Sequence, residues 1–336
     1  MAARRRTMRW QRLLLRVIET SEQRGQRMSR AEAMRFGVGL GRLAMAAARR
    51  PRRIAQSNLA LAFGDTLSYA DRQALVQRVF QHFGKTAVDF LRGPLLRTRE
   101  DLDALFASVE GWEEHAAEAV RAGRPVIFCG AHLGNWELQG RWIAAQGVPL
   151  TVVARTPEDP HFGQWVQRMR EGAGLSVASK GDSARRLLSL LKRGEALGVL
   201  PDQNSGDLFV PFFGTPCGTV AGPALFALRT EALLVCCYCF REPDDRYRLV
   251  FYPPIPAHPG VGGATQEEDV FHIMAAVNRQ LEAAIREYPD QWLWLHHRWK
   301  AAFEEKNRAR WPEGFSFDTS KQYWESSFAS GKKAGF

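Results

Sequence analysis

From residue 125 to residue 252, short apolar runs alternate with stretches in which apolar residues recur every three or four positions. The runs predict buried strands, and the recurring positions predict helices. The expected strands span 125–129, 149–154, 175–178, 196–200, 232–240 and 246–252. The expected helices between them span 136–145, 161–171, 183–193 and 219–230. This alternation predicts an α/β fold in which a mostly parallel central sheet is flanked by helices on both faces.

Longer helical patterns flank this region. They are expected at 69–91, 111–122 and 266–287. Another helix is expected over 29–48, because Ser29 and Glu32 form a capping-box pattern at its start. The stretch 201–218 is rich in Pro and Gly and is expected to be a loop.

The N-terminal segment has an amphipathic pattern with a basic polar side. Its apolar residues follow helical spacing at Trp10, Leu13, Leu14, Val17 and Ile18. Such a helix is suited to lie in the interface of an anionic bilayer. The alternative is a solvated, partly disordered basic arm. The pattern does not fit a signal peptide, and Arg35 and Arg42 make the next helix a poor transmembrane span.

The positive charge is concentrated at one end of the chain. The net charge is +10, but residues 1–60 alone carry +12 and the remainder carries −2. This asymmetry indicates an anionic partner for the N-terminal end. A nucleic acid is disfavoured, since the segment has no recognition motif and few interleaved aromatics. We expect a membrane-associating segment at 1–60, the α/β domain at 61–314 and a disordered tail at 315–336.

The five cysteines do not indicate disulfides or a metal centre. Their number is odd and no secretory signal precedes them, which is typical of a reducing compartment. Cys236 and Cys239 form a C-x-x-C, but they lie in an expected strand, where residues three apart face opposite ways. We expect no metal, because His132 and Glu137 lack a third ligand at the usual spacing.

The segment PVIFCGAHLGNWE, residues 125–137, carries the first candidate site. His132 lies in an expected strand-to-helix turn, and Glu137 lies in the first turn of the helix that Asn135 is expected to cap. Glu137 could reach back to the imidazole, so that His132 becomes a general base with an oriented ring. The alternative is a buried structural histidine and a carboxylate that only complements the helix dipole.

Other polar residues follow other expected strands. Arg155 follows strand 149–154 and Asp202 follows strand 196–200. Ligands of open parallel sheets bind beyond the carboxyl ends of the strands, so these side chains are expected to share one site with His132 and Glu137. The apolar segment just beyond Asp202 is either a buried connection or a wall for a hydrocarbon chain. Its aromatic residues are Phe209, Phe212 and Phe213.

These motifs together resemble the bacterial lipid A biosynthesis acyltransferases, the late lauroyl/myristoyl transferases of the lysophospholipid acyltransferase superfamily. The resemblance runs from about residue 52 to residue 300 and rests on GAHLGNWE, PDQ, PFFG and QWLWLHHRWK in this order. The H-x4-D/E motif of the family falls on His132 and Glu137, its arginine on Arg155 and its PDQ aspartate on Asp202. The chain departs from the family in a more basic N-terminus and an insertion at 301–310.

The resemblance implies transfer of a fatty acyl group from acyl carrier protein to a hydroxyl of a Kdo-bearing lipid A precursor. The reaction would take place at the cytoplasmic face of the inner membrane, without a cofactor. Arg155 would stabilise the oxyanion or bind a substrate phosphate, and Asp202 would orient Arg155 or bind an acceptor hydroxyl or amide. Asn135, Gln203 and the three phenylalanines would contact substrate.

Two alternatives remain open at this stage. One keeps the chemistry and changes the acceptor to a phospholipid, a mannosylated phosphoinositide or an aminolipid. The other is a non-catalytic lipid-binding protein on the same fold, against which the presence of all four polar residues argues.

Overall fold

The computed structural model describes residues 20–155, 157, 159–179, 184–256 and 265–312. The helix expected around residues 10–18 and the tail expected from residue 315 lie outside these ranges. In the described part, all five cysteines are buried and free.

A seven-stranded sheet forms the centre of the fold, in the order β1-β9-β8-β2-β5-β3-β4. Only the β8–β9 pair is antiparallel, and the other neighbours in this sheet are parallel. The strands are β1 (Phe106–Glu110), β2 (Val126–Cys129), β3 (Leu150–Ala154), β4 (Ser176–Ser179), β5 (Ala196–Val199), β8 (Leu233–Arg241) and β9 (Tyr247–Phe251). The predicted α/β fold with a mostly parallel sheet is confirmed.

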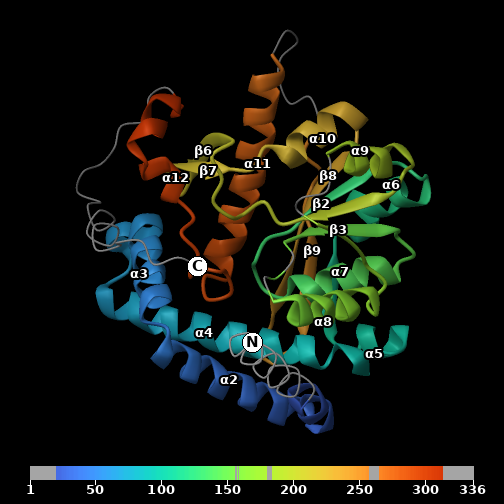
Figure 1. Ribbon diagram of the computed structural model, residues 1–336, viewed down its shortest axis with the longest axis vertical. Coiled ribbons are helices and arrows are strands. Elements are labelled where there is room, and N and C mark those ends of the chain that lie inside the picture. Colours follow the sequence, from blue (N-terminus) through green and yellow to red (C-terminus); the bar gives the residue numbers. More distant parts are fainter. Residues whose placement is uncertain (1–19, 156, 158, 180–183, 257–264, 313–336) are drawn as a thin grey trace, which may run out of the picture.

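Helices cover both faces of the sheet (Figure 1). One face packs against the segment around Trp112 and against α7, which contributes Leu138, Trp142 and Ile143. The other face packs against a larger cluster that includes residues of α9, α10, α11 and the tryptophan-rich C-terminal segment. The helices are α6 (Glu118–Arg121), α7 (Trp136–Ala145), α8 (Pro160–Glu171), α9 (Ala184–Lys192), α10 (Gly222–Thr230), α11 (Gln266–Glu287) and α12 (Lys300–Phe303).

Three helices before the sheet form a layer along one end of the molecule (Figure 1). They are α2 (Arg30–Ala47), α3 (Arg49–Phe63) and α4 (Tyr69–Leu91), with the short α5 (Arg99–Asp103) after them. The capping box of Ser29 and Glu32 begins α2 as predicted. The helices α2 and α4 pack closely through glycines: a Cβ on Gly84 would lie 2.1 Å from the carbonyl oxygen of Gly37. The domain boundary expected at residue 60 falls inside α3.

The sequence predicted a loop over 201–218, and this prediction is wrong: the stretch contains most of an antiparallel hairpin. Its strands are β6 (Leu208–Phe212) and β7 (Thr215–Thr219). Phe213 and Gly214 form the two-residue turn, and both have positive φ, at 50° and 67°. This geometry matches the right-handed twist of a hairpin. Phe-Gly is not among the pairs that usually indicate such a turn, and the prolines within the two strands argue against strands, so the sequence carried little signal for this hairpin.

Short helical segments complete the fold. The expected helix at 111–122 is a π-helical turn followed by α6, and the insertion at 301–310 forms most of α12 and a 3-10 segment. The short segments that are not α-helical are η1 (Gly64–Thr66), η2 (Gly93–Leu95), the π-helical η3 (Glu113–Ala117) and η4 (Glu305–Arg310). Within the residues that the structure describes, none of the helices combines the length and the apolar character needed to cross a bilayer.

Candidate active site

The turn between β2 and α7 places His132 at the carboxyl edge of the sheet. Asn135 caps α7 by accepting a hydrogen bond from the backbone N–H of Leu138 at 3.1 Å. Gly134 has φ +63°, and a Cβ at this position would lie 1.9 Å from the carbonyl oxygen of Cys239. Only glycine fits a left-handed conformation pressed against another backbone. The turn is therefore fixed by its own sequence and by β8.

His132 and Asp202 form a hydrogen-bonded pair. The Nδ1 atom of His132 lies 2.8 Å from Oδ1 of Asp202, and the backbone N–H of His132 donates to Oδ2 at 2.9 Å. The strands β2 and β5 are neighbours, with Cys129 opposite Val199. Each residue of the pair follows its strand by three positions, so the register brings them together.

The C-terminal tryptophan segment completes the environment of the pair. The indole N–H of Trp292 donates to Oδ2 of Asp202 at 2.9 Å. The backbone of the same segment runs beside residues 130–135, the candidate catalytic turn, since Leu293 N–H donates to the carbonyl of His132 at 3.0 Å. Trp292 is a site residue that the sequence analysis did not single out, although it belongs to the QWLWLHHRWK motif.

The electrostatics of the pair suit a general base. Burial acts to raise the pKa of Asp202, but the positive charge and hydrogen bonds of His132, with the Trp292 indole, outweigh it and lower the pKa to about 2. Burial acts to lower the pKa of His132, but the Asp202 carboxylate raises it above its ordinary value. Because the carboxylate can only accept, Nδ1 of His132 carries a proton. In the neutral ring, Nε2 therefore carries the free lone pair.

The prediction that Glu137 orients the imidazole is wrong, because Asp202 binds Nδ1. Glu137 instead forms a two-point ion pair with Arg170 of α8, with N–O distances of 2.6 and 3.1 Å. Both residues still act on His132 electrostatically: Glu137 raises its pKa and Arg170 lowers it. Glu137 thus belongs to the charged surroundings of the base, together with an arginine that the sequence analysis missed.

Arg155 follows β3 at the carboxyl edge of the sheet, as predicted, and its membership of the site stays a prediction. It is exposed at the end of β3, and β3 is separated from β2 by β5. Two strand spacings amount to about 10 Å. The cation that acts on the pKa of His132 is Arg170. The sequence left open whether Asp202 orients Arg155 or binds an acceptor group, and in the structure its carboxylate binds His132 and Trp292.

Two polar residues were predicted to contact substrate, and the structure places Asn135 in the interior and Gln203 at the surface. Asn135 is buried, and its amide is used within the protein, where it caps α7 and donates to the Tyr247 hydroxyl at 3.0 Å. Gln203 is exposed beside Asp202, and its backbone carbonyl accepts a long bond from Arg298. The geometry therefore favours a structural role for Asn135 and leaves Gln203 available to a ligand.

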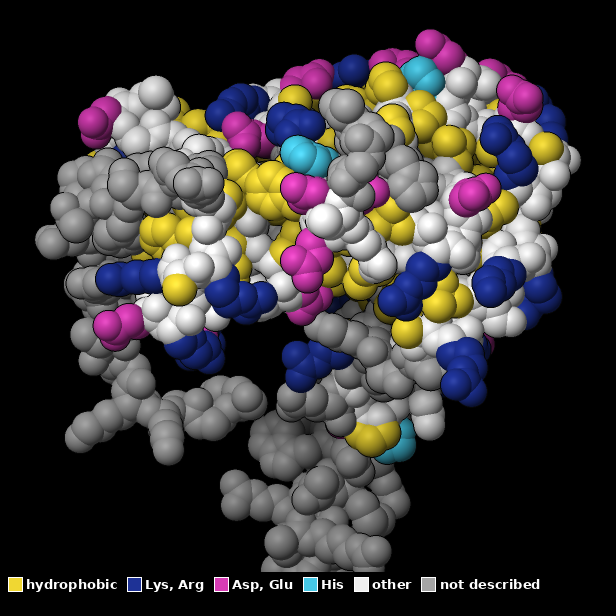
Figure 2. Space-filling model, turned by 90° about the horizontal axis from the view of Figure 1, so that it is seen from above, with side chains coloured by type: hydrophobic (Ala, Val, Ile, Leu, Met, Phe, Trp, Pro, Cys, Tyr) yellow, Lys and Arg dark blue, Asp and Glu magenta, His cyan; other side chains and the backbone are white. Residues whose placement is uncertain are grey.

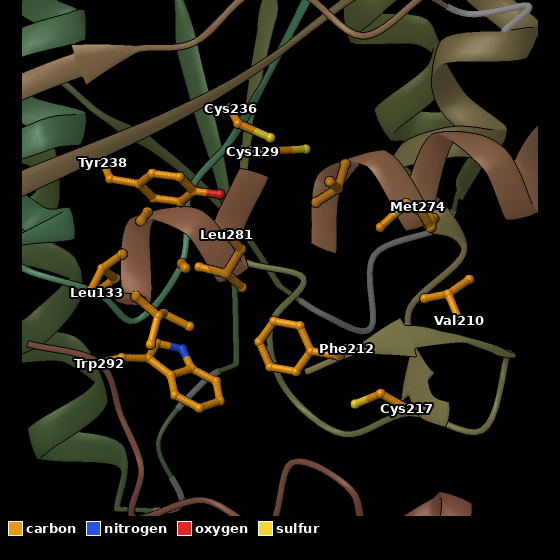
Figure 3. Close-up of a cluster of buried hydrophobic side chains, with 14 of the residues drawn as sticks. Cys129, Leu133, Val210, Phe212, Cys217, Cys236, Tyr238, Met274, Leu281 and Trp292 are labelled. Carbon is orange, nitrogen blue, oxygen red and sulfur yellow. The ribbon is translucent and has the colours of Figure 1, made fainter. Parts of the chain in front are cut away.

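The three phenylalanines have two different environments. Phe212 and Phe213 are buried in the core, where Phe212 stacks on Trp299 and meets the edge of Trp292 (Figure 3). Phe209 lines a cavity of about 500 Å³ between the hairpin and the first turns of α11. Figure 2 looks onto this end of the molecule, where hydrophobic side chains are interspersed with charged ones. A role as a hydrocarbon wall thus fits Phe209 better than its two neighbours.

A second histidine lies near the pair. Nε2 of His296 accepts the backbone N–H of Asn204 at 3.1 Å, so its proton is on Nδ1. Burial lowers the pKa of His296, and both Asp202 and His132 act on it. The chain segment of His296 is held by Asn58 of α3, whose amide donates to the carbonyls of Trp294 and His296 at 2.7 Å. A neutral imidazole is thereby fixed near His132.

A histidine held in one orientation at the carboxyl edge of a parallel sheet is suited to take a proton from a nucleophile. The family model of bacterial lipid A biosynthesis acyltransferases matches residues 26–301 of this chain. The chain therefore belongs to this family and is an acyltransferase. An enzyme of this kind needs an acyl donor and a lipid acceptor.

Similar proteins include members with different acceptors in their names. The lipid A biosynthesis lauroyltransferase of Escherichia coli is 28% identical over 272 residues, which cover 79% of this chain and 84% of the relative. The phosphatidylinositol mannoside acyltransferase of Mycolicibacterium smegmatis is 28% identical over 203 residues, 59% of this chain and 64% of the relative. A solved 1-acyl-sn-glycerophosphate acyltransferase from Thermotoga maritima aligns with 79% of this chain and 99% of its own, at 13% identity and a TM-score of 0.34.

Proposed function

We propose that this acyltransferase transfers a fatty acyl chain from the thioester of acyl carrier protein to a hydroxyl of a lipid A precursor of the Kdo-lipid IVA type. The observation that carries the chemistry is the His132–Asp202 pair with its Nε2 atom directed away from the carboxylate. The choice of acceptor is supported by the family match and by the lauroyltransferase relative.

In the proposed reaction the acceptor hydroxyl attacks the thioester carbonyl while Nε2 of His132 takes its proton. The Asp202 carboxylate stabilises the imidazolium that forms. Collapse of the tetrahedral intermediate breaks the C–S bond, and the proton on His132 passes to the leaving thiolate. The products are an ester and the carrier thiol, so no covalent acyl-enzyme and no cofactor are required.

Positive groups near the pair would stabilise the negative charge of the intermediate and of the substrates. Arg170 acts electrostatically on His132, and the amides at the start of α7 lie at the same edge of the sheet. Arg155, exposed at this edge, would bind a phosphate of the acceptor. Gln203 and Phe209 would contact the acceptor and the acyl chain.

We further propose that the enzyme works at the cytoplasmic face of the inner membrane, attached peripherally through its N-terminal segment. Three of the large exposed hydrophobic side chains lie on α2 alone: Phe36, Leu40 and Leu43, with exposed fractions of 49%, 38% and 70%. Arg35 and Arg42 are exposed on the same helix. An apolar stripe flanked by arginines suits the interface of an anionic bilayer.

A different acceptor is the main competing function, because phosphatidylinositol mannoside acyltransferases are among the relatives. The test is incubation of purified protein with labelled acyl carrier protein and each candidate acceptor, followed by mass spectrometry of the lipids. Transfer to the lipid A precursor alone supports the proposal, and transfer only to a mannosylated phosphoinositide or a phospholipid refutes the acceptor. His132→Ala should lower the rate roughly 10²–10⁴-fold; undiminished transfer would remove His132 as the base.

A further inference from the structure

Tyr247, the first residue of β9, lies between the catalytic turn and the N-terminal helices. It is fully buried, and its hydroxyl accepts a hydrogen bond from the Asn135 amide at 3.0 Å. The same hydroxyl donates to Oδ2 of Asp89 in α4. One phenol group therefore connects the residue that caps α7 to a carboxylate on another layer of the molecule.

The catalytic turn depends on contacts of this kind. Asn135 follows His132 by three residues, and its backbone N–H donates to the carbonyl of Cys239 at 2.8 Å. The preceding carbonyl, that of Gly134, lies 3.0 Å from Nε2 of His82, which is also on α4. The turn is thus held from the sheet on one side and from α4 on the other.

Asp89 also holds the helix with the exposed apolar stripe. Its Oδ1 atom pairs with Arg30, the first residue of α2, at 2.9 Å, and its Oδ2 atom pairs with Arg241 at 2.6 Å. The side chains of Asp89 and Arg241 are each only 4% exposed, whereas that of Arg30 is 28% exposed. The link to α2 is the solvent-accessible edge of an otherwise buried cluster.

We propose that Asp89 is a positioning residue that couples the seating of α2 to the geometry of the catalytic turn, through the hydroxyl of Tyr247 and the amide of Asn135. When Arg30 is seated, Asp89 keeps Tyr247 in place, Tyr247 keeps Asn135 in place, and His132 keeps its bond to Asp202. Loss of one link leaves a buried polar group without its partner and loosens the turn. This inference rests on the proposed role of His132 as the base.

Two substitutions interrupt the connection without emptying the core. Tyr247→Phe removes only the hydroxyl and keeps the ring, which packs near Phe106. Arg30→Gln removes the charge at the edge of the cluster. Tyr252→Phe is the matched control, since Tyr252 lies just past the end of β9 and its ring packs on Tyr238 rather than on the Asp89 cluster. Arg229→Gln is the control for the loss of one positive charge, because Arg229 is exposed near the end of α10 and has no part in the Asp89 cluster or in the exposed stripe of α2.

The first measurement is steady-state acyl transfer by the full-length variants. We expect Tyr247→Phe to lower kcat on the order of tenfold with little change in KM, because small displacements of a base cost rate rather than binding. Arg30→Gln should lower kcat in the same direction. The double variant should be no slower than Tyr247→Phe alone, since the two residues act in one chain of contacts. The two control variants should keep the wild-type kcat.

The second measurement needs no substrate: an NMR titration of the His132 ring. A looser turn weakens the bond to Asp202, so His132 of Tyr247→Phe should titrate at a lower pH than in the wild type. An unchanged titration and kcat in Tyr247→Phe, with only a lower melting temperature, would overturn the inference and reduce the cluster to a stability element. Additive losses in the double variant would refute the coupling to α2. If the wild type transfers no acyl group, the proposed function fails, while the titration still decides this inference.

Discussion

At the scale of single residues, the charge state of His132 controls the expected pH profile. As the proposed base, His132 would act only when it is neutral, and its pKa lies above the ordinary value because Asp202 stabilises the imidazolium. The rate should therefore rise as the pH increases through this raised pKa. The Asp202 carboxylate, which would assist the proposed base, should thus also shift its working pH range upward.

Asp202→Asn tests this relation. The neutral amide removes the charge that raises the pKa of His132, so the acidic limb of the kcat/KM profile should move to lower pH. The maximal rate should fall about 10²–10⁴-fold, because the imidazolium loses its partner. A profile with its acidic limb unmoved would show that the limb belongs to another group.

Glu137→Gln is the matched comparison with Asp202→Asn, because the sequence first suggested Glu137 as the partner of His132. Its carboxylate is paired with Arg170 and affects the pKa of His132 only electrostatically. We expect a shift of the acidic limb in the same direction as for Asp202→Asn, but smaller. A larger shift in Glu137→Gln would mean that Glu137, and not Asp202, is the main partner of the base in solution.

The sequence identified His132 and Asp202 but not their relation. Linear spacing favoured Glu137 as the partner, because it is the nearest carboxylate along the chain. The actual partner is set by strand order: β5, which follows β3 in the chain, lies between β2 and β3 in the sheet. The same order separates Arg155, which follows β3, from His132 by the width of β5. Strand order depends on the packing of whole helices and is not written in any local pattern.

At the scale of elements, close contact between α2 and α4 depends on glycines that face each other. Gly84→Ala would place a Cβ 2.1 Å from the carbonyl oxygen of Gly37. The helices must then separate, at a cost of about 1–3 kcal/mol or more in the free energy of unfolding. Gly39→Ala is the control, since a Cβ there meets no atom within 4 Å. It should stabilise α2 by up to about 1 kcal/mol.

Thermal unfolding of both variants decides this point. Equal melting temperatures for Gly84→Ala and Gly39→Ala would mean that the helices are not in close contact in solution.

Regular elements such as α4 and α11 were predictable, because long amphipathic patterns and caps define them locally. The edge strand β1 was not, since its short sequence gains its strand character only by pairing with β9.

At the scale of the whole molecule, buried histidines make the stability depend on pH. Burial, followed by the charge of Arg241, lowers the pKa of His82 to about 3. Its Nε2–H donates to the carbonyl of Gly134, and the lowered pKa keeps the ring neutral in the folded state at pH 5–7. An unfolded histidine titrates near 6.5. Between these values the unfolded chain binds a proton that the folded chain does not, and stability falls as the pH decreases.

His82→Gln keeps a donor amide and removes the titrating group. The wild type should lose about 2 kcal/mol more of its unfolding free energy than this variant between pH 7 and pH 5, at roughly 1.4 kcal/mol per pH unit below the unfolded pKa. Urea unfolding at the two pH values measures the difference. Equal losses in both proteins would show that His82 is not a buried neutral histidine.

The exposed stripe on α2 defines the side on which the molecule should meet lipid. The helix α4 lies between α2 and the catalytic turn, since it contacts α2 through Gly84 and the turn through His82. A lipid surface against α2 would therefore be one helix layer from the base. Binding should weaken with salt, because the arginines act through exposed charges.

Replacing Phe36, Leu40 and Leu43 by Gln should reduce binding to vesicles that contain anionic lipid at least tenfold, which corresponds to about 1.4 kcal/mol. This is a conservative expectation, because each of the three apolar side chains can contribute roughly 1.5–3 kcal/mol when it is buried. Tyr69→Gln is the matched control, since Tyr69 is 63% exposed on α4 and lies outside the stripe. Vesicle sedimentation of the full-length proteins measures both. If the stripe variant binds as tightly as the control, membrane attachment does not use α2, and the basic residues before it must act alone.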